Sequence, residues 1–247
     1  HIFISHMHGD HCFGLPGLIS TLGMLGRNGE LVIHGPKETE TYLRPILNTF
    51  CRELPYPIRF NHIAPDQHEL IWEDRSVSVY SIPLKHRLPT SGFLFAEKAK
   101  EAHIIKEMTD FYQIPVRLLP SIKRGEDYIT PEGERIPNGR LTRPASTPKK
   151  YAYCSDTAYY EKIIPIIEGV DLLYHEATFA SEDAARAKET FHSTARQAAE
   201  IARKANVKRL VIGHYSARYE ELHTLKKEAD EIFPGTILAD EGMTLTV

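Results

Sequence analysis

The stretch His6-Met7-His8-Gly9-Asp10-His11 places three imidazoles and one carboxylate directly after the apolar run Ile2-Phe3-Ile4. His6 and His8 are two positions apart, so on an extended segment both rings project to the same side and can bind one cation. Asp10 and His11 follow Gly9, where the chain can turn sharply, and should point to a neighbouring position. Donors crowded in this way repel one another unless a divalent ion compensates them. The stretch therefore predicts a pocket for two metal ions.

A solvated histidine-rich loop or a tag remnant is the alternative interpretation of this stretch. A tag, however, does not interleave Asp and Gly behind a β-branched strand.

Three later strand-like segments each lead to a residue of the same ligand types. Val77–Ile82 leads to His86, Tyr151–Cys154 leads to Asp156, and Arg209–Gly213 leads to His214. In a layered α/β fold the carboxyl ends of strands meet at one edge, so these side chains can join the first cluster there.

The ligand inventory suits two zinc ions. We expect one ion to be bound by His6, His8 and His86, the other by Asp10, His11 and His214, and both by a bridging Asp156 carboxylate. Nitrogen and oxygen donors without thiolate favour zinc, and the same set also suits manganese, iron or cobalt.

The His-x-His-x-Asp-His signature, followed in order by His86, Asp156 and His214, resembles the metallo-β-lactamase superfamily. More narrowly, four motifs resemble the ribonuclease Z family, whose members trim the 3′ trailer from precursor tRNA. They are Ser155-Asp156-Thr157, His175-Glu176-Ala177-Thr178-Phe179, His192-Ser193-Thr194 and His214-Tyr215-Ser216-Ala217-Arg218-Tyr219. The resemblance runs over nearly the whole chain. It implies an α/β fold of the αβ/βα sandwich type and a homodimer.

Members of that family begin with several strands ahead of the first metal motif, and this sequence opens on that motif. We therefore expect a single domain over residues 1–247 that lacks its N-terminal strands, with an inserted arm at about residues 98–150.

Composition fits one domain with a large core. The chain has 247 residues, of which 42% are hydrophobic, and its net charge of −3 argues against a generally basic nucleic-acid coat. The three widely separated cysteines, Cys12, Cys51 and Cys154, give no disulfide framework and indicate a reducing compartment, here the cytoplasm. No apolar stretch approaches the roughly twenty residues that span a bilayer, so no membrane partner is expected.

Periodicity predicts strands first and an alternation of strands and helices later. The same patterns predict a helix over Glu101–Tyr112, a helix near Tyr160 and a final strand at Met243.

The arm breaks this alternation. After Tyr112 it is interrupted so often by Pro and Gly that core elements are not expected. Between Arg117 and Lys150 it carries eight Lys or Arg against four Asp or Glu. An ordinary solvated insertion would also have such a charge. In the ribonuclease Z family this location carries a protruding arm that grips the body of the tRNA, so the resemblance implies an RNA clamp that includes Lys123 and Arg124.

One departure concerns this arm. The family has a Gly-Pro step where this sequence reads Pro115-Val116-Arg117-Leu118-Leu119-Pro120, although Ile122-Lys123-Arg124-Gly125 fits the stretch after it.

Hydrolysis of a phosphodiester needs a nucleophile, an electrophile and a proton donor. Two ions about 3.5 to 4 Å apart can hold a bridging hydroxide and neutralise charge on the phosphate. Asp10 is assigned the additional role of general base or water orienter. Glu176 and His192 are the candidate proton donors to the leaving oxygen, the carboxylate keeping the imidazole charged. A buried salt bridge for Glu176 and a helix-cap position for His192 are the structural alternatives.

Arg218 is a candidate phosphate contact, with an ordinary surface ion pair as its alternative. Three functions remain open at this point. They are a zinc endoribonuclease for precursor tRNA, another hydrolase of this fold acting on a small phosphodiester or (thio)ester, and a non-catalytic RNA-binding protein. A basic arm disfavours the second, and a complete ligand set disfavours the third.

Overall fold

The computed structural model describes residues 1–247, which form two compact units. The main unit contains residues 1–74, 78–96 and 149–247, and the small unit contains residues 75–77 and 97–148. Most of the arm therefore lies in the small unit.

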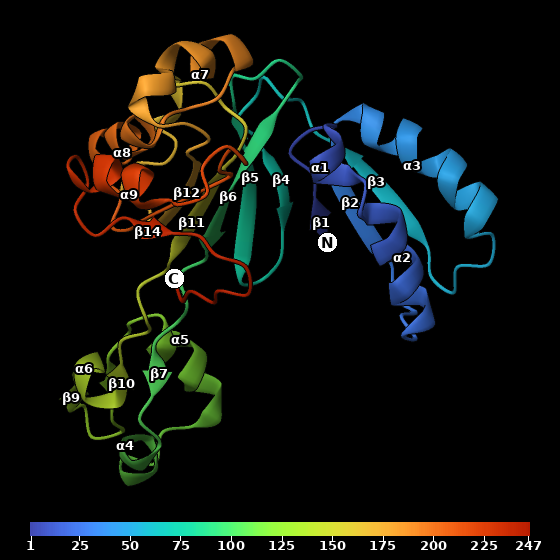
Figure 1. The fold of residues 1–247 in the computed structure, drawn as a ribbon. Coiled ribbons are helices and arrows are strands. Elements are labelled where there is room, and N and C mark those ends of the chain that lie inside the picture. Colours follow the sequence, from blue (N-terminus) through green and yellow to red (C-terminus); the bar gives the residue numbers. More distant parts are fainter. The chain divides into compact units, whose positions relative to one another are not determined.

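The larger sheet of the main unit has seven strands in the order β14-β13-β12-β11-β6-β5-β4 (Figure 1). Their bounds are β4 Leu70–Glu73, β5 Val77–Pro83, β6 Ser91–Glu97, β11 Lys150–Cys154, β12 Leu172–Glu176, β13 Leu210–Gly213 and β14 Ile237–Leu238. Strands β11 to β14 pair in parallel, whereas β6 pairs with β11 and β4 with β5 in antiparallel fashion. Parallel neighbours end at the same edge, which brings the residues after β11, β12 and β13 together.

The smaller sheet of the main unit contains β1 Ile2–Phe3, β2 Leu31–Gly35 and β3 Ile58–His62, all parallel. The ring of Phe3 lies 5.4 Å from the rings of both Phe93 and Phe95 on β6, so aromatic packing joins the two sheets. The residues that follow β1 are thereby placed beside the larger sheet.

Helices cover the outer faces of both sheets. The helices of the main unit are α1 Gly9–Cys12, α2 Leu15–Met24, α3 Lys37–Phe50, α7 Ala184–Thr190, α8 Ala195–Lys204 and α9 His223–Asp230, with short 3-10 turns at Glu161–Ile163 and Ser181–Asp183. In Figure 1, α8 and α9 lie along the β11–β14 part of the larger sheet. The α2 and α3 helices pack on the smaller sheet through Ile19, Leu43 and Leu47.

Helix α8 shows why this layer is close-packed. Thr194 begins it with a capping box, in which its hydroxyl accepts from the Gln197 N–H and the Gln197 side chain accepts from the Thr194 N–H. Its buried face consists mainly of alanines, which let the helix approach Leu173 and Ile212 closely.

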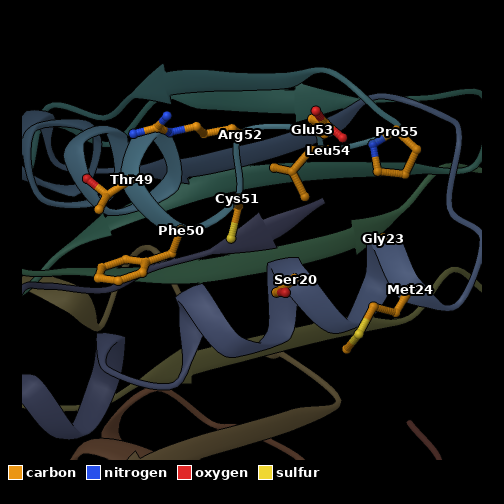
Figure 2. Close-up of a pocket in the computed structure, with 10 residues that line it drawn as sticks. All are labelled: Ser20, Gly23, Met24, Thr49, Phe50, Cys51, Arg52, Glu53, Leu54 and Pro55. Atoms are coloured by element: carbon orange, nitrogen blue, oxygen red, sulfur yellow. The ribbon is translucent and has the colours of Figure 1, made fainter.

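A surface groove lies between α2 and the segment after α3, lined by Met24, Phe50 and Cys51 among others (Figure 2). None of the candidate metal ligands lines it. No helix of the structure combines the length and the apolar character needed to cross a membrane.

The small unit contains β7 His103–Ile104, α4 Lys106–Phe111, a 3-10 turn at Val116–Leu118, α5 Leu119–Lys123, β8 Tyr128–Ile129, β9 Arg135–Ile136, α6 Asn138–Leu141 and β10 Thr142–Arg143. The expectation that this stretch is too interrupted for core elements is wrong. Ile122, Ile136 and Leu141 are almost fully buried in a core of its own. The Asn138 amide donates to the carbonyls of Ile122 and Glu126. Side-chain hydrogen bonds of this kind hold the small unit together where long backbone ladders between strands are absent.

Three other expectations need correction. The helix expected over Glu101–Tyr112 begins only at Lys106, because His103–Ile104 pairs with Thr142–Arg143 as a strand. The turn near Tyr160 is a 3-10 helix over Glu161–Ile163, and no strand forms at Met243.

Candidate metal centre

All seven predicted ligands lie in the main unit, either within a short helix or in the loop that follows a strand. His6 and His8 are in the loop between β1 and α1, and Asp10 and His11 lie in α1. His86, Asp156 and His214 follow β5, β11 and β13 by three, two and one residues, respectively. The structure brings these five segments together, although up to 208 positions separate their residues along the chain.

The first group of donor atoms contains three histidines and one carboxylate oxygen. His8 Nδ1 lies 2.9 Å from His6 Nε2 and 3.2 Å from His86 Nε2. Asp156 Oδ2 lies 3.5 Å from His6 Nε2 and 3.7 Å from His86 Nε2. Four donor atoms thus converge on one point.

The second group lies on the other side of the same carboxylate. Asp156 Oδ1 is 3.2 Å from both His11 Nε2 and His214 Nε2. Asp10 Oδ2 is 3.5 Å from His11 Nε2 and 3.8 Å from His214 Nε2. Asp156 therefore offers one oxygen to each group.

These spacings fit a pair of divalent cations. Tetrahedral zinc binds nitrogen and oxygen at about 2.0 to 2.2 Å, which places neighbouring ligand atoms about 3.3 Å apart. The distances within both groups scatter around that value. The donor chemistry agrees, because imidazole and carboxylate without thiolate are ligands for zinc and similar metals.

The protonation of the buried groups also suits metal binding. Burial lowers the pKa of His6 to about 3 and lowers the pKa of His86 as well, so both rings are neutral and carry a free lone pair at pH 7. Burial raises the pKa of the Asp156 carboxyl, but a hydrogen bond from His11 and the charges of the surrounding histidines outweigh it and hold that pKa well below its usual range. Asp156 is therefore ionised.

Backbone strain accompanies two of the candidate ligands. Asp156 and His214 both have a φ of 59°, and Phe191 has a φ of 60°. Side chains other than glycine rarely adopt this left-handed region, and residues held there cost about 1 to 3 kcal/mol each and cluster at functional sites. At Asp156 and His214 the left-handed conformation occurs just after a parallel strand, at residues that belong to the cluster.

Polar groups outside the cluster fix the orientation of its rings. His86 Nδ1 donates to the Phe191 carbonyl at 2.9 Å, which leaves Nε2 of His86 free for the cluster. The Ser5 hydroxyl lies 3.0 Å from His6 Nδ1 and 3.5 Å from His11 Nδ1.

Gly9 has a different role from the one expected. It begins helix α1 and its φ is not positive, so no left-handed turn occurs there. A Cβ at Gly9 would instead lie 2.4 Å from the ring of Phe13. The absence of a side chain lets the ring of Phe13 approach the backbone that carries the ligands.

Glu176 and His192 lie beside the cluster as a hydrogen-bonded pair. His192 Nδ1 donates to Glu176 Oε1 at 2.9 Å, and the Glu176 carboxylate is fully buried. Burial lowers the pKa of His192, but the hydrogen bond and charge of Glu176 outweigh it and raise that pKa above 6.5. The His192 ring stacks on the His214 ring with a centroid distance of 5.3 Å.

The three predicted substrate-binding residues lie outside this cluster. Lys123 and Arg124 are exposed at the end of α5 in the small unit. Arg218 forms an ion pair with Asp183 at 3.0 Å, and its guanidinium lies 5.0 Å from the centre of the Phe179 ring.

Sequence reasoning missed several residues that contact the candidate ligands. Ser5, Thr178 and the Phe191 carbonyl each contact a candidate ligand. Thr178 lies within a motif that was singled out, whereas Ser5 and Phe191 gave no signal apart from their neighbours.

Comparison with known proteins points to one family. A profile described as a beta-lactamase superfamily domain matches residues 140–215. The chain is 78% identical over 247 residues to Ribonuclease Z of Parabacteroides distasonis, covering all of this chain and 81% of that protein. It is 58% identical to Ribonuclease Z of Bacteroides fragilis, again over all of this chain and 81% of the relative.

Among solved structures, the short form of human tRNase Z superposes with a TM-score of 0.65 at 24% identity. The match covers 99% of this chain and 78% of the human one. At that identity the likeness concerns the fold, and it confirms the predicted α/β sandwich of the metallo-β-lactamase type.

Proposed function

The chain belongs to the ribonuclease Z family of the metallo-β-lactamase superfamily, and from that premise we propose how the residues of its candidate metal centre take part in RNA cleavage. The protein is a metal-dependent endoribonuclease that processes the 3′ end of precursor tRNA. The observation that carries the catalytic assignment is the Asp156 carboxylate, which presents one oxygen to each group of ligands.

We assign two zinc ions to the site. His6, His8 and His86 would hold one, Asp10, His11 and His214 the other, and Asp156 both. Manganese, iron or cobalt fits the same donors. When bound, the two cations would share a water molecule, lower its pKa and neutralise charge on the attacked phosphate.

Asp10 is the residue to which we assign contact with the attacking water. Its carboxylate is 68% exposed, in contrast to the 2% of Asp156, so one of its oxygens remains open to solvent beside the second group. A carboxylate in this place can orient the water and accept its proton.

His192 supplies the proton that the leaving ribose 3′-oxygen needs. Glu176 holds Nδ1 of His192 and stabilises the charged imidazole, which leaves Nε2 as the atom that donates. Because Glu176 is buried, it acts through His192 and does not itself touch the RNA.

A cleavage assay tests this function. The full chain is incubated with zinc and a tRNA that carries a 3′ extension, in parallel with Asp10→Ala. Release of the trailer by the parent protein, together with a loss of about 100-fold or more in the variant, is expected for a group that orients the attacking water. Hydrolysis of a small phosphodiester without any trailer release would contradict the assignment.

We propose that the small unit binds the body of the tRNA through phosphate contacts that include Lys123 and Arg124. Both side chains are exposed, and they belong to a stretch with an excess of positive charge in an otherwise acidic protein. Arg218 is proposed to contact a phosphate near the scissile bond. For this, its guanidinium must leave its ion pair with Asp183 and bind the RNA phosphate instead.

Replacing both Lys123 and Arg124 by alanine should weaken tRNA binding and reduce its salt dependence. Each lost phosphate contact lowers the slope of log affinity against log salt by about 0.7 to 0.9. Turnover of bis(p-nitrophenyl) phosphate should stay unchanged, because neither residue belongs to the metal centre and this substrate has no tRNA body to bind. The matched control replaces Lys188 and Lys227, which are exposed on α7 and α9. An unchanged salt slope in the Lys123/Arg124 variant would exclude these residues from the RNA interface.

We further propose that the protein is a homodimer that acts in the cytoplasm, where bacterial tRNA precursors are made. Met24, Leu25 and Phe50 are strongly exposed apolar side chains, and Met24 and Phe50 line the same groove (Figure 2). Exposed apolar surface of this kind is typical of a subunit contact. Light scattering on the full chain measures the oligomeric state.

A further inference from the structure

Thr178 occupies a position between the two parts of the catalytic site. It follows β12 by two residues and is almost fully buried. Its hydroxyl oxygen lies 2.6 Å from Glu176 Oε2, 2.9 Å from His214 Nδ1 and 3.4 Å from His192 Nδ1. One small side chain thus contacts a candidate metal ligand and the pair that supplies the proton.

Elementary hydrogen-bond chemistry fixes the direction of the two shorter contacts. A carboxylate only accepts, so the Thr178 hydroxyl donates its single proton to Glu176. The hydroxyl oxygen must then accept from His214, whose proton therefore sits on Nδ1. This tautomer leaves the lone pair of His214 Nε2 directed at Asp156 Oδ1, where a metal ligand needs it.

Glu176 is the common anchor of this arrangement. Its Oε1 accepts from the Thr157 N–H at 2.7 Å and from His192 at 2.9 Å. Its Oε2 accepts from the Ser193 N–H at 3.1 Å as well as from Thr178. The Thr178 N–H adds a fifth, longer contact to Oε2 at 3.4 Å. These donors fix the place of the carboxylate, and its full burial keeps out water that could replace a lost partner.

We propose that Thr178 is a positioning residue. Its hydroxyl is held by Glu176 and in turn fixes the orientation of the His214 ring. One buried carboxylate then aligns both the proton donor and the second metal subsite, which contains Asp10, His11 and His214. The inference rests on the proposed function for its catalytic meaning, but its effect on metal binding does not depend on the substrate.

The backbone of Thr178 makes a separate contact that substitution would preserve. Its carbonyl accepts from the Ser216 N–H at 3.1 Å and so holds the loop that carries His214. Changes at the side chain therefore test the hydroxyl alone. Thr178→Val replaces the hydroxyl by a methyl group of similar size, Thr178→Ala removes it without adding bulk, and Thr178→Ser retains it.

The experiment titrates zinc into the metal-free full chain by calorimetry and measures cleavage of a 3′-extended tRNA by the same proteins. We expect Thr178→Val and Thr178→Ala to lose about 10- to 100-fold in affinity for one of the two zinc ions, as is usual when the partner of a ligating histidine is removed. The affinity for the other ion should be unchanged. kcat should fall by a similar factor while KM for tRNA stays within about twofold, and Thr178→Ser should recover most of both losses.

Controls separate this role from packing. Thr190→Val removes a hydroxyl that bonds only the Arg186 carbonyl within α7, and it should change neither zinc binding nor turnover. If Thr178→Val does not fold, as judged by circular dichroism, Thr178→Ala carries the test. Normal affinity for both zinc ions in the variant that lacks the hydroxyl would overturn the proposal, as would a Thr178→Ser protein as impaired as Thr178→Val. If the parent protein binds two zinc ions but releases no trailer, the proposed function fails while the zinc titration still decides the role of Thr178.

Discussion

Replacing Asp156 by asparagine should reduce trailer cleavage by about 10³-fold or more. Asp156 is buried and ionised, and its two oxygens lie within 3.7 Å of four histidine nitrogens that belong to different donor groups. An asparagine keeps one oxygen but turns an NH2 group toward the other histidines, so one subsite loses its ligand and both lose the negative charge. Metal ions supply several kcal/mol of charge stabilisation in such reactions, and each 1.36 kcal/mol corresponds to a factor of ten in rate.

Asp171→Asn is the matched control for this substitution. Asp171 is another buried aspartate, but it pairs with Lys149 and Lys208 away from the cluster. Its replacement should lower the melting temperature and leave turnover per folded molecule close to that of the parent. Measured metal content distinguishes the two variants further, since only Asp156→Asn should lose bound zinc. Undiminished cleavage by Asp156→Asn would exclude the carboxylate as a bridge.

Replacing His192 by alanine should lower kcat for precursor tRNA by about 10²- to 10³-fold, the usual contribution of a general acid. The ribose 3′-oxygen is a poor leaving group and needs the proton that His192 Nε2 carries. Bis(p-nitrophenyl) phosphate releases a stable phenolate that needs no proton. Its turnover should therefore fall far less, and the ratio of the two losses is the measurement.

His192 is also close enough to Asp156 and His214 to serve as a metal ligand, and the same experiment separates the two roles. Equal losses for both substrates, accompanied by loss of zinc, would identify His192 as a ligand and contradict its role as acid. His223→Ala, which removes an exposed histidine at the start of α9, controls for the loss of an imidazole and should leave both rates unchanged.

The sequence predicts much of this site because ligand residues lie at strand ends. The runs before Asp156 and His214 are apolar and β-branched or aromatic, and parallel strands of this kind end at a common edge. The α/β sandwich was predictable for this reason and from the resemblance of the motifs. His86 follows β5 of the larger sheet, whereas the opening motif follows β1 of the smaller sheet, so their clustering depends on the packing of the two sheets.

The remaining features depend on contacts that no local pattern encodes. The φ of 59° at Asp156 and His214 is uncommon for residues other than glycine, and a sequence pattern that predicts a strand gives no indication of it. The contact of His86 with the Phe191 carbonyl joins residues 105 positions apart, and any residue type has a carbonyl.

In the small unit, the sequence indicated the local elements but not how they pack together. Its prolines and glycines correctly indicated short elements, but the spacing did not reveal that Ile122 and Ile136 share a buried core, because elements of two to six residues are too short for periodicity to register.

Anomalous diffraction from crystals grown with zinc, recorded on both sides of the zinc absorption edge, tests the two-metal site most directly. Two peaks are predicted, one among His6, His8 and His86 and one among Asp10, His11 and His214, with an oxygen of Asp156 bound to each. A single peak, or a second peak that Asp156 does not contact, would contradict the proposed centre.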